Sequence, residues 1–173
     1  VTSIGFTFKY QGVDYTQFSA NAAGLLKLGS VAVTAQTVND ATSTTNVPKL
    51  YAVWDAFYTG TSASGGGVTY ALTGTAPNRV LTVQWKVNTT SATTASGTNF
   101  QIKLYETSNV IEYYYGAVAA VPSASVGLGG LTANDYLSIL PVSGAISNSV
   151  NFNTLTSAPV NGTKYTFTPT AAL

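Results

Sequence analysis

Alternation of apolar and polar residues with a period of two is the feature that most restricts how this 173-residue chain can fold. It is clearest in two runs, 100–105 and 111–115, on either side of Ser108-Asn109. Such alternation sends successive side chains to opposite faces of a β-strand. We therefore predict a β-hairpin whose two-residue turn at Ser108-Asn109 sets Leu104 opposite Tyr113.

The same signature, or a short apolar run bounded by turn residues, recurs along the rest of the chain. No segment has a convincing helical period, and no repeat of about 20 to 50 residues is present. The expected strands cover residues 4–9, 14–19, 22–29, 50–57, 68–73, 79–87, 100–105, 111–115, 125–128, 136–140 and 164–168. The polar stretches 38–48, 59–67 and 88–97 lack periodicity, and we expect them to be loops.

Composition favours the same fold class. Hydrophobic residues make up 45 % of the chain and charged residues only 8 %, against roughly 25 % charged in an average soluble domain. Val, Thr, Tyr and Phe fit a pleated, half-buried surface. We predict an all-β fold, an antiparallel two-sheet β-sandwich of jelly-roll-like type with about ten or more short strands. The length suits one core, so residues 1–173 are expected to form a single domain.

Charge and hydropathy exclude several partners. The net charge of +1 comes from charged residues scattered singly, so no basic stripe exists for nucleic acid. No apolar stretch reaches the roughly 18 to 20 residues of a membrane-spanning helix, and we expect no membrane insertion. The weakly charged, Thr-, Ser- and Asn-rich composition points to an extracellular protein.

Five segments of the chain, in order, carry a family resemblance. They are IGFTFKYQGVDYTQFS from Ile4, LYAVWDA from Leu50, NRVLTVQW from Asn78, FQIKLYETSNVIEYYYG from Phe100 and NGTKYTFTP from Asn161. Together they resemble a group of secreted Bacteroidetes surface proteins and, more distantly, nidogen-like extracellular domains. The resemblance implies an extracellular β-sandwich at the bacterial cell surface, which serves as an adhesive or architectural module and has no shared catalytic motif.

The residues of common catalytic and metal sites are scarce. The chain has no His and no Cys, which excludes the triads and zinc sites built from them. A glycosidase needs only two carboxylates at a defined separation, but nothing in the sequence pairs the acidic residues. These are Asp14, Asp40, Asp55, Glu106, Glu112 and Asp135. We expect no enzyme activity, no cofactor and no metal.

Asp55 is the one polar residue singled out as a site. It follows Trp54 at the end of an apolar run, where an acid can ligate calcium with loop carbonyls or orient a sugar. An Asp at a strand end more often caps a turn through the neighbouring backbone. We favour the turn-capping interpretation.

An aromatic surface is the second candidate site. In the run Tyr113-Tyr114-Tyr115, alternation sends Tyr114 to the face opposite its neighbours. We expect Tyr105, Tyr114 and Trp85 to share an outward surface that stacks on sugar rings or packs against another subunit. The alternative is that a second sheet or a loop covers this surface.

These observations lead to three hypotheses of function. The first is an extracellular structural or adhesive domain that self-associates, as an oligomer or polymer, or assembles with other surface proteins through sheet edges and tyrosine-rich faces. The second is a carbohydrate-binding module on a secreted protein. The third, a hydrolase, requires two of the six carboxylates to converge in a cleft.

Overall fold

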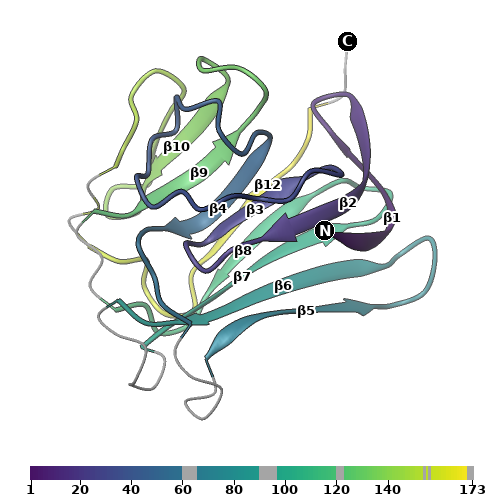
Figure 1. The fold of residues 1–173 in the computed structure, drawn as a ribbon, viewed down its shortest axis with the longest axis horizontal. Helices are drawn as coiled ribbons and strands as arrows, with labels where there is room; N and C mark the ends of the chain where they lie inside the picture. Colours follow the sequence, from purple (N-terminus) through teal and green to yellow (C-terminus); the bar gives the residue numbers. More distant parts are fainter. Residues whose placement is uncertain (60–65, 90–96, 120–122, 154, 156, 171–173) are drawn as a thin grey trace.

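The computed structural model describes residues 1–59, 66–89, 97–119, 123–153, 155 and 157–170. These residues form twelve β-strands and contain no helix (Figure 1). The strands build two antiparallel sheets packed around a shared core, which confirms the predicted all-β sandwich. The loops predicted at 59–67 and 88–97 fall mostly on residues 60–65 and 90–96, which lie outside the described part of the chain.

The larger sheet has seven strands in the order β1-β2-β3-β4-β9-β10-β11. They are β1 (Thr2–Tyr10), β2 (Val13–Ala20), β3 (Leu25–Leu28), β4 (Lys49–Trp54), β9 (Ser125–Gly129), β10 (Tyr136–Leu140) and β11 (Ala145–Ser147). The smaller sheet has five strands in the order β12-β8-β7-β6-β5. They are β5 (Gly67–Thr73), β6 (Val80–Val87), β7 (Thr98–Tyr105), β8 (Ile111–Tyr115) and β12 (Lys164–Phe167).

The connectivity refines the jelly-roll-like expectation. The chain completes β1 to β4 as a meander, crosses to build β5 to β8, returns to add β9 to β11 beside β4, and finally adds β12 beside β8. It therefore changes sheet only three times between successive strands. Two interrupted meanders are the result, and among the described strands the edge positions are taken by β1 and β11 in the larger sheet and by β5 and β12 in the smaller one.

The main core lies between the two sheets, as the alternation predicts. On β6 the odd-numbered residues Leu81, Val83 and Trp85 are at most 1 % exposed, and their even-numbered neighbours face outward. The indole ring of Trp85 stacks on the ring of Phe100 from β7, with 5.1 Å between ring centroids. Burial of such large rings supplies much of the driving force for packing the sheets.

A smaller second core covers the other face of the larger sheet. Segment 30–48 folds back over β3 and β4, so β4 is buried on both sides, as its apolar sequence predicts. Trp54 donates its indole N–H to the carbonyl of Gln36, 2.9 Å away. This second core consists of Ala23, Leu25, Ala41, Tyr51, Trp54 and Tyr136.

A buried lysine holds this covering segment in place. The side chain of Lys49 is fully buried, and its ammonium group donates to the carbonyls of Asp40 and Ser43 at 3.2 and 2.8 Å. It also lies 4.8 Å from the ring centroid of Trp54. Carbonyl dipoles and an aromatic face replace the water that this charge loses on burial.

The register predicted for the β7–β8 hairpin is wrong by two residues. Leu104 lies opposite Ile111, and Tyr113 lies opposite Ile102. The cause is a longer turn, in which the amide of Tyr105 donates to the carbonyl of Val110. The shift is even, so every side chain keeps its predicted face.

Candidate functional site

Two of the three predicted aromatic residues lie together on the outer face of the smaller sheet. Tyr105 ends β7, and Tyr114 lies on β8, with their side chains directed away from the core and half-buried. Trp85 does not join them, because it is 0 % exposed and belongs to the inner face. The expectation that Trp85 shares this surface is therefore wrong, and the strand alternation itself assigns Trp85 to the core.

Glu112 organises this surface, which we call the outer tyrosine face (Tyr105, Glu112, Tyr114, Lys103 and Lys164). Its carboxylate accepts hydrogen bonds from the hydroxyls of Tyr105 (2.5 Å) and Tyr114 (2.8 Å). Lys164 donates to the other oxygen at 2.9 Å. Antiparallel pairing of β8 with β7 and β12 brings these side chains side by side.

The chemistry of Glu112 follows from its partners. Burial by itself raises the pKa of Glu112, but the hydrogen bonds from Tyr105, Lys164 and Tyr114 outweigh burial and lower the pKa to about 2. Burial and the bond to Glu112 also raise the pKa of Tyr105 above its ordinary value. At neutral pH the carboxylate is thus ionised, and with the hydrogen bonds that it accepts from both hydroxyls it forms a stabilising network.

Lysine side chains limit access to the aromatic ring. The ammonium group of Lys103 lies 4.4 Å from the ring centroid of Tyr114, and that of Lys164 lies 5.8 Å away. Cations at these distances interact with the π-system. A sugar that stacked on Tyr114 would have to displace them.

Asp55 behaves as a turn-capping residue. Its Oδ1 accepts the amide of Ala56 at 2.7 Å, and both carboxylate oxygens accept the hydroxyl of Ser123, at 3.2 and 3.0 Å. These contacts tie the end of β4 to the segment that leads into β9. The geometry agrees with the favoured interpretation from sequence.

The other carboxylates also have specific partners. Glu106 forms a bidentate ion pair with Arg79, with distances of 2.6 and 2.9 Å. Asp14 pairs with Lys9. Asp40 accepts the amide and hydroxyl of its neighbour Thr42. Among the described residues no three acidic side chains gather where they could hold a metal ion.

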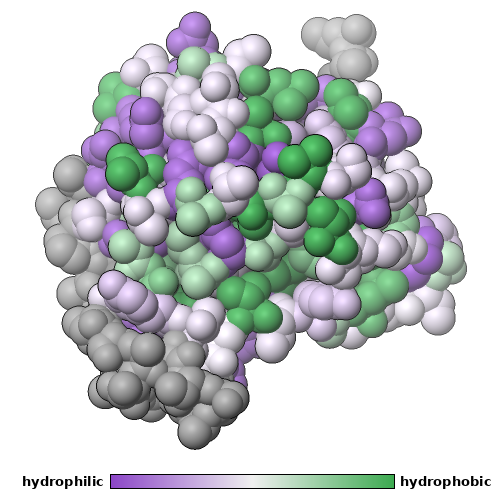
Figure 2. Space-filling model, viewed as in Figure 1, coloured by the Kyte–Doolittle hydropathy of each residue, from purple (hydrophilic) through white to green (hydrophobic). Residues whose placement is uncertain are grey.

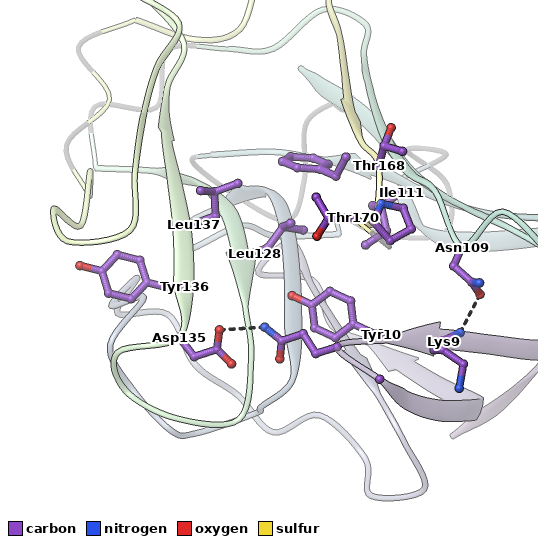
Figure 3. Close-up of a pocket in the computed structure, with 14 residues that line it drawn as sticks. Lys9, Tyr10, Asn109, Ile111, Leu128, Asp135, Tyr136, Leu137, Thr168 and Thr170 are labelled. Carbon is purple, nitrogen blue, oxygen red and sulfur yellow. Dashed lines mark hydrogen bonds between the residues drawn. The ribbon is translucent and has the colours of Figure 1, made fainter. Parts of the chain in front are cut away.

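A cleft that the sequence analysis missed opens at one end of the sandwich (Figure 3). Its volume is about 460 Å³. It lies where the β1–β2 hairpin and the segment after β12 meet the ends of β8, β9 and β10. In Figure 3 the ring of Tyr10 points into the cleft with Leu128 and Ile111, whereas the ring of Tyr136 points away. Apolar side chains from both sheets thus line its interior.

Polar side chains fix the hairpin that forms one wall of this cleft. The amide of Lys9 donates to Asn109 Oδ1 at 2.8 Å, and Gln11 Nε2 donates to Asp135 Oδ1 at 2.8 Å. The β1–β2 hairpin thereby contacts both sheets, since Asn109 precedes β8 of the smaller sheet and Asp135 precedes β10 of the larger one. Burial, reinforced by the charge of Asp135, raises the pKa of Tyr10, so its hydroxyl stays a neutral donor.

Only a weak sequence signal pointed to the cleft. Gln11-Gly12 identifies a turn, and the positive φ values of both residues (50° and 78°) show why a glycine is useful there. The approach of this turn to Asn109 and Asp135, about a hundred residues away, depends on sheet packing. Sequence periodicity indicates which face of a strand a residue occupies, and it does not indicate which distant segments pack together.

Comparison with known proteins identifies the family. Within the described residues, no helix is long and apolar enough to cross a membrane. No curated protein and no solved structure matches the chain. The family model described as NIDO related matches residues 1–169, and a domain of this kind fits an extracellular structural or adhesive role. The chain belongs to the NIDO-related family.

Proposed function

We propose that this chain is a non-catalytic structural or adhesive domain of the bacterial cell surface, and that it self-associates through an open edge of its smaller sheet. The family supports the extracellular structural role. The observation that carries self-association is the unequal protection of the four sheet edges.

Three edges have features that discourage pairing with another strand. β1 changes register between Ser3 and Phe8, and its Gly5 carbonyl is occupied by Arg79 Nη1 at 2.5 Å. β11 has only three residues. β12 has four and begins with Lys164. Irregularity, shortness and lysine are the usual protections of edge strands in soluble proteins.

β5 lacks all three protections. It has seven residues, GVTYALT, with no charge and no proline, and it pairs with β6 in an unbroken register. In Figure 1 it forms the lower rim of the sandwich, and in Figure 2 that rim is mostly white to green, the colours of weakly polar and hydrophobic residues. An edge of this kind is a template for an added strand.

The placement of the carboxylates supports the non-catalytic part of the proposal. Glu106 and Glu112 are each neutralised by a cation, and Asp55 is used for turn capping. Catalysis by a carboxylate pair requires two such groups facing one substrate. The partners of these acids instead fix turns and strands.

The direct test is the assembly state of the purified domain. Light scattering after size-exclusion chromatography should show a mass that rises with concentration, and negative-stain microscopy should show ordered oligomers. A monomer mass at every concentration would refute self-association. Loss of assembly on Tyr114→Glu, with β5 unchanged, would assign the contact to the outer tyrosine face.

A carbohydrate-binding module is the second candidate, and the cleft is the observation that favours it. There the ring of Tyr10 lies near the amide of Gln11 and the carboxylate of Asp135, a combination typical of sugar sites. Binding on a glycan array that is lost in Tyr10→Ala and kept in Tyr58→Ala would support it. Tyr58 is a suitable control because it is 49 % exposed and does not line the cleft. A blank array would count against this function.

A further inference from the structure

We propose that β5 pairs antiparallel with β5 of a second copy, about a two-fold axis at Tyr70. The two five-stranded sheets would then form one continuous ten-stranded sheet. This inference rests on the proposed self-association and adds the partner, the strand and the register.

The sequence of β5 is self-complementary in this register. Val68, Tyr70 and Leu72 point to the inner side of the sheet, because their partners on β6 are core residues. With the axis at Tyr70, Val68 of one copy lies opposite Leu72 of the other, and Tyr70 lies opposite its equivalent. Apolar side chains thus meet apolar side chains. A slip of one residue would put the second copy's inner side chains on the wrong side of the sheet.

Apolar surface on β5 remains to be buried by a partner. Because β5 is the last strand of its sheet, Tyr70 is 58 % and Leu72 is 44 % exposed although both point inward. Beside Tyr70 a hollow of about 230 Å³ opens between β5 and β2. A neighbouring β5 strand would cover these side chains and extend over this hollow.

The edge is held in a fixed conformation in the free domain. The ring of Tyr70 packs edge-to-face on Phe18, with 5.7 Å between centroids. Leu72 lies against Gly5, where an added Cβ would come within 2.5 Å of it. Little ordering is therefore required when a second strand adds, which reduces the entropic cost of association.

Charge and symmetry favour a second copy of this chain as the source of the strand that pairs with β5. The seven residues of β5 carry no charge, so two copies can approach edge to edge without like-charge repulsion. A two-fold contact uses the same strand from both partners and leaves no further β5 edge free. The expected product is a closed dimer.

Single cysteines test the register directly, because the chain has no cysteine of its own. Opposed residues of an antiparallel pair have Cα atoms roughly 4.5 to 5.5 Å apart, within the span of a disulfide. In the proposed dimer Tyr70→Cys places two thiols opposite each other. The matched control, Leu72→Cys, separates them by four residues along the strands, about 13 Å. We expect at least tenfold faster formation of disulfide-linked dimer for Tyr70→Cys under mild oxidation.

The outcomes separate the two proposals. Equal or slower cross-linking of Tyr70→Cys, in a domain that does assemble, overturns the β5 dimer and leaves self-association standing. A wild-type domain that is monomeric at every concentration overturns both. Circular dichroism of each variant establishes that it is folded before its cross-linking is compared.

A charge at the axis gives an independent test. Tyr70→Lys sets two ammonium groups opposite each other, and we expect at least a tenfold increase in the dissociation constant measured by sedimentation. Ile146→Lys is the matched control, since Ile146 is 62 % exposed on the edge strand β11. Weakening by Ile146→Lys and not by Tyr70→Lys would overturn the β5 contact in favour of the other sheet.

Discussion

The two inward tyrosines of β8 offer the sharpest test of how the sheets are joined. The hydroxyl of Tyr113 donates to the carbonyl of Gly127 on β9 at 2.7 Å and accepts the amide of Tyr51 on β4 at 3.2 Å. The hydroxyl of Tyr115 donates to the carbonyl of Ala52 at 2.8 Å. Both reach the place where the register between β4 and β9 shifts. They therefore link the smaller sheet to backbone groups of the larger one.

The decrease in unfolding free energy on removing these hydroxyls follows from the number of hydrogen bonds lost. Tyr113→Phe takes a partner from two buried backbone groups and Tyr115→Phe from one, in positions that are at most 3 % exposed. A buried polar group left without its partner costs about 1 to 3 kcal/mol. We expect losses in unfolding free energy of about 3 kcal/mol for Tyr113→Phe and about 1.5 kcal/mol for Tyr115→Phe.

Thermal unfolding followed by circular dichroism measures this series. At about 2 to 4 °C per kcal/mol for a chain of this size, Tm should fall by about 6 to 12 °C in Tyr113→Phe and by about half as much in Tyr115→Phe. The control is Tyr114→Phe, whose hydroxyl bonds to Glu112 on the outer face. Its loss should cost less than about 1 kcal/mol. If Tyr113→Phe is no more destabilising than Tyr114→Phe, the tyrosine links do not stabilise the sandwich.

Three further perturbations have directions fixed by the structure. Hydrogen bonds lower the pKa of Glu112 from 4.5 to about 2, so its contribution to stability is present above pH 4.5 and is lost as the pH falls towards 2. In Glu112→Gln, the free energy of unfolding measured in urea should therefore fall less steeply between pH 4.5 and 2. Burial lowers the pKa of Lys49 to about 8, although the charge of Asp40 acts in the opposite direction. Because Lys49 keeps its proton in the unfolded chain up to about pH 10.5, the free energy of unfolding should rise from pH 8 to 10. Lys49→Met should abolish this rise. Gly24→Ala should lower the free energy of unfolding in urea by at least about 3 kcal/mol, because φ is +87° and the new Cβ would lie 1.8 Å from the carbonyl oxygen of Val53. Gly12→Ala, where φ is +78° and the space around the new Cβ is open, should lower it by about 1 kcal/mol.

Periodicity predicted the faces of strands well and their partners poorly. Alternation along β6 sets Leu81 and Val83 on one face, which is the core face, and the uninterrupted apolar run of β4 agrees with its burial on both sides. The register of the β7–β8 hairpin did not follow, because Thr107 and Asn109 adopt positive φ and lengthen the turn. Neither residue is the glycine that commonly signals such a conformation.

The candidate sites show the same division. Alternation places Tyr114 outward, as the structure has it, but in the sequence its partner Glu112 is only one of six scattered acidic residues. Recognising the network required knowing that β12 pairs with β8 and brings Lys164 to Glu112 from 52 residues away. Long-range strand order is set by how the two sheets pack, and no local pattern encodes it.

The strand β5 shows a conflict between sequence and position that a second copy would resolve. An uncharged run such as GVTYALT is typical of an interior strand, whereas edge strands of soluble proteins usually carry lysine, proline or a bulge. The free domain nevertheless leaves β5 at the rim, with Tyr70 and Leu72 pointing inward and each about half exposed. In the proposed dimer β5 becomes one of the two central strands of a ten-stranded sheet, a position that its sequence suits. The absence of charge on β5 then favours assembly, and a lysine introduced there should weaken the dimer and make the free domain more soluble.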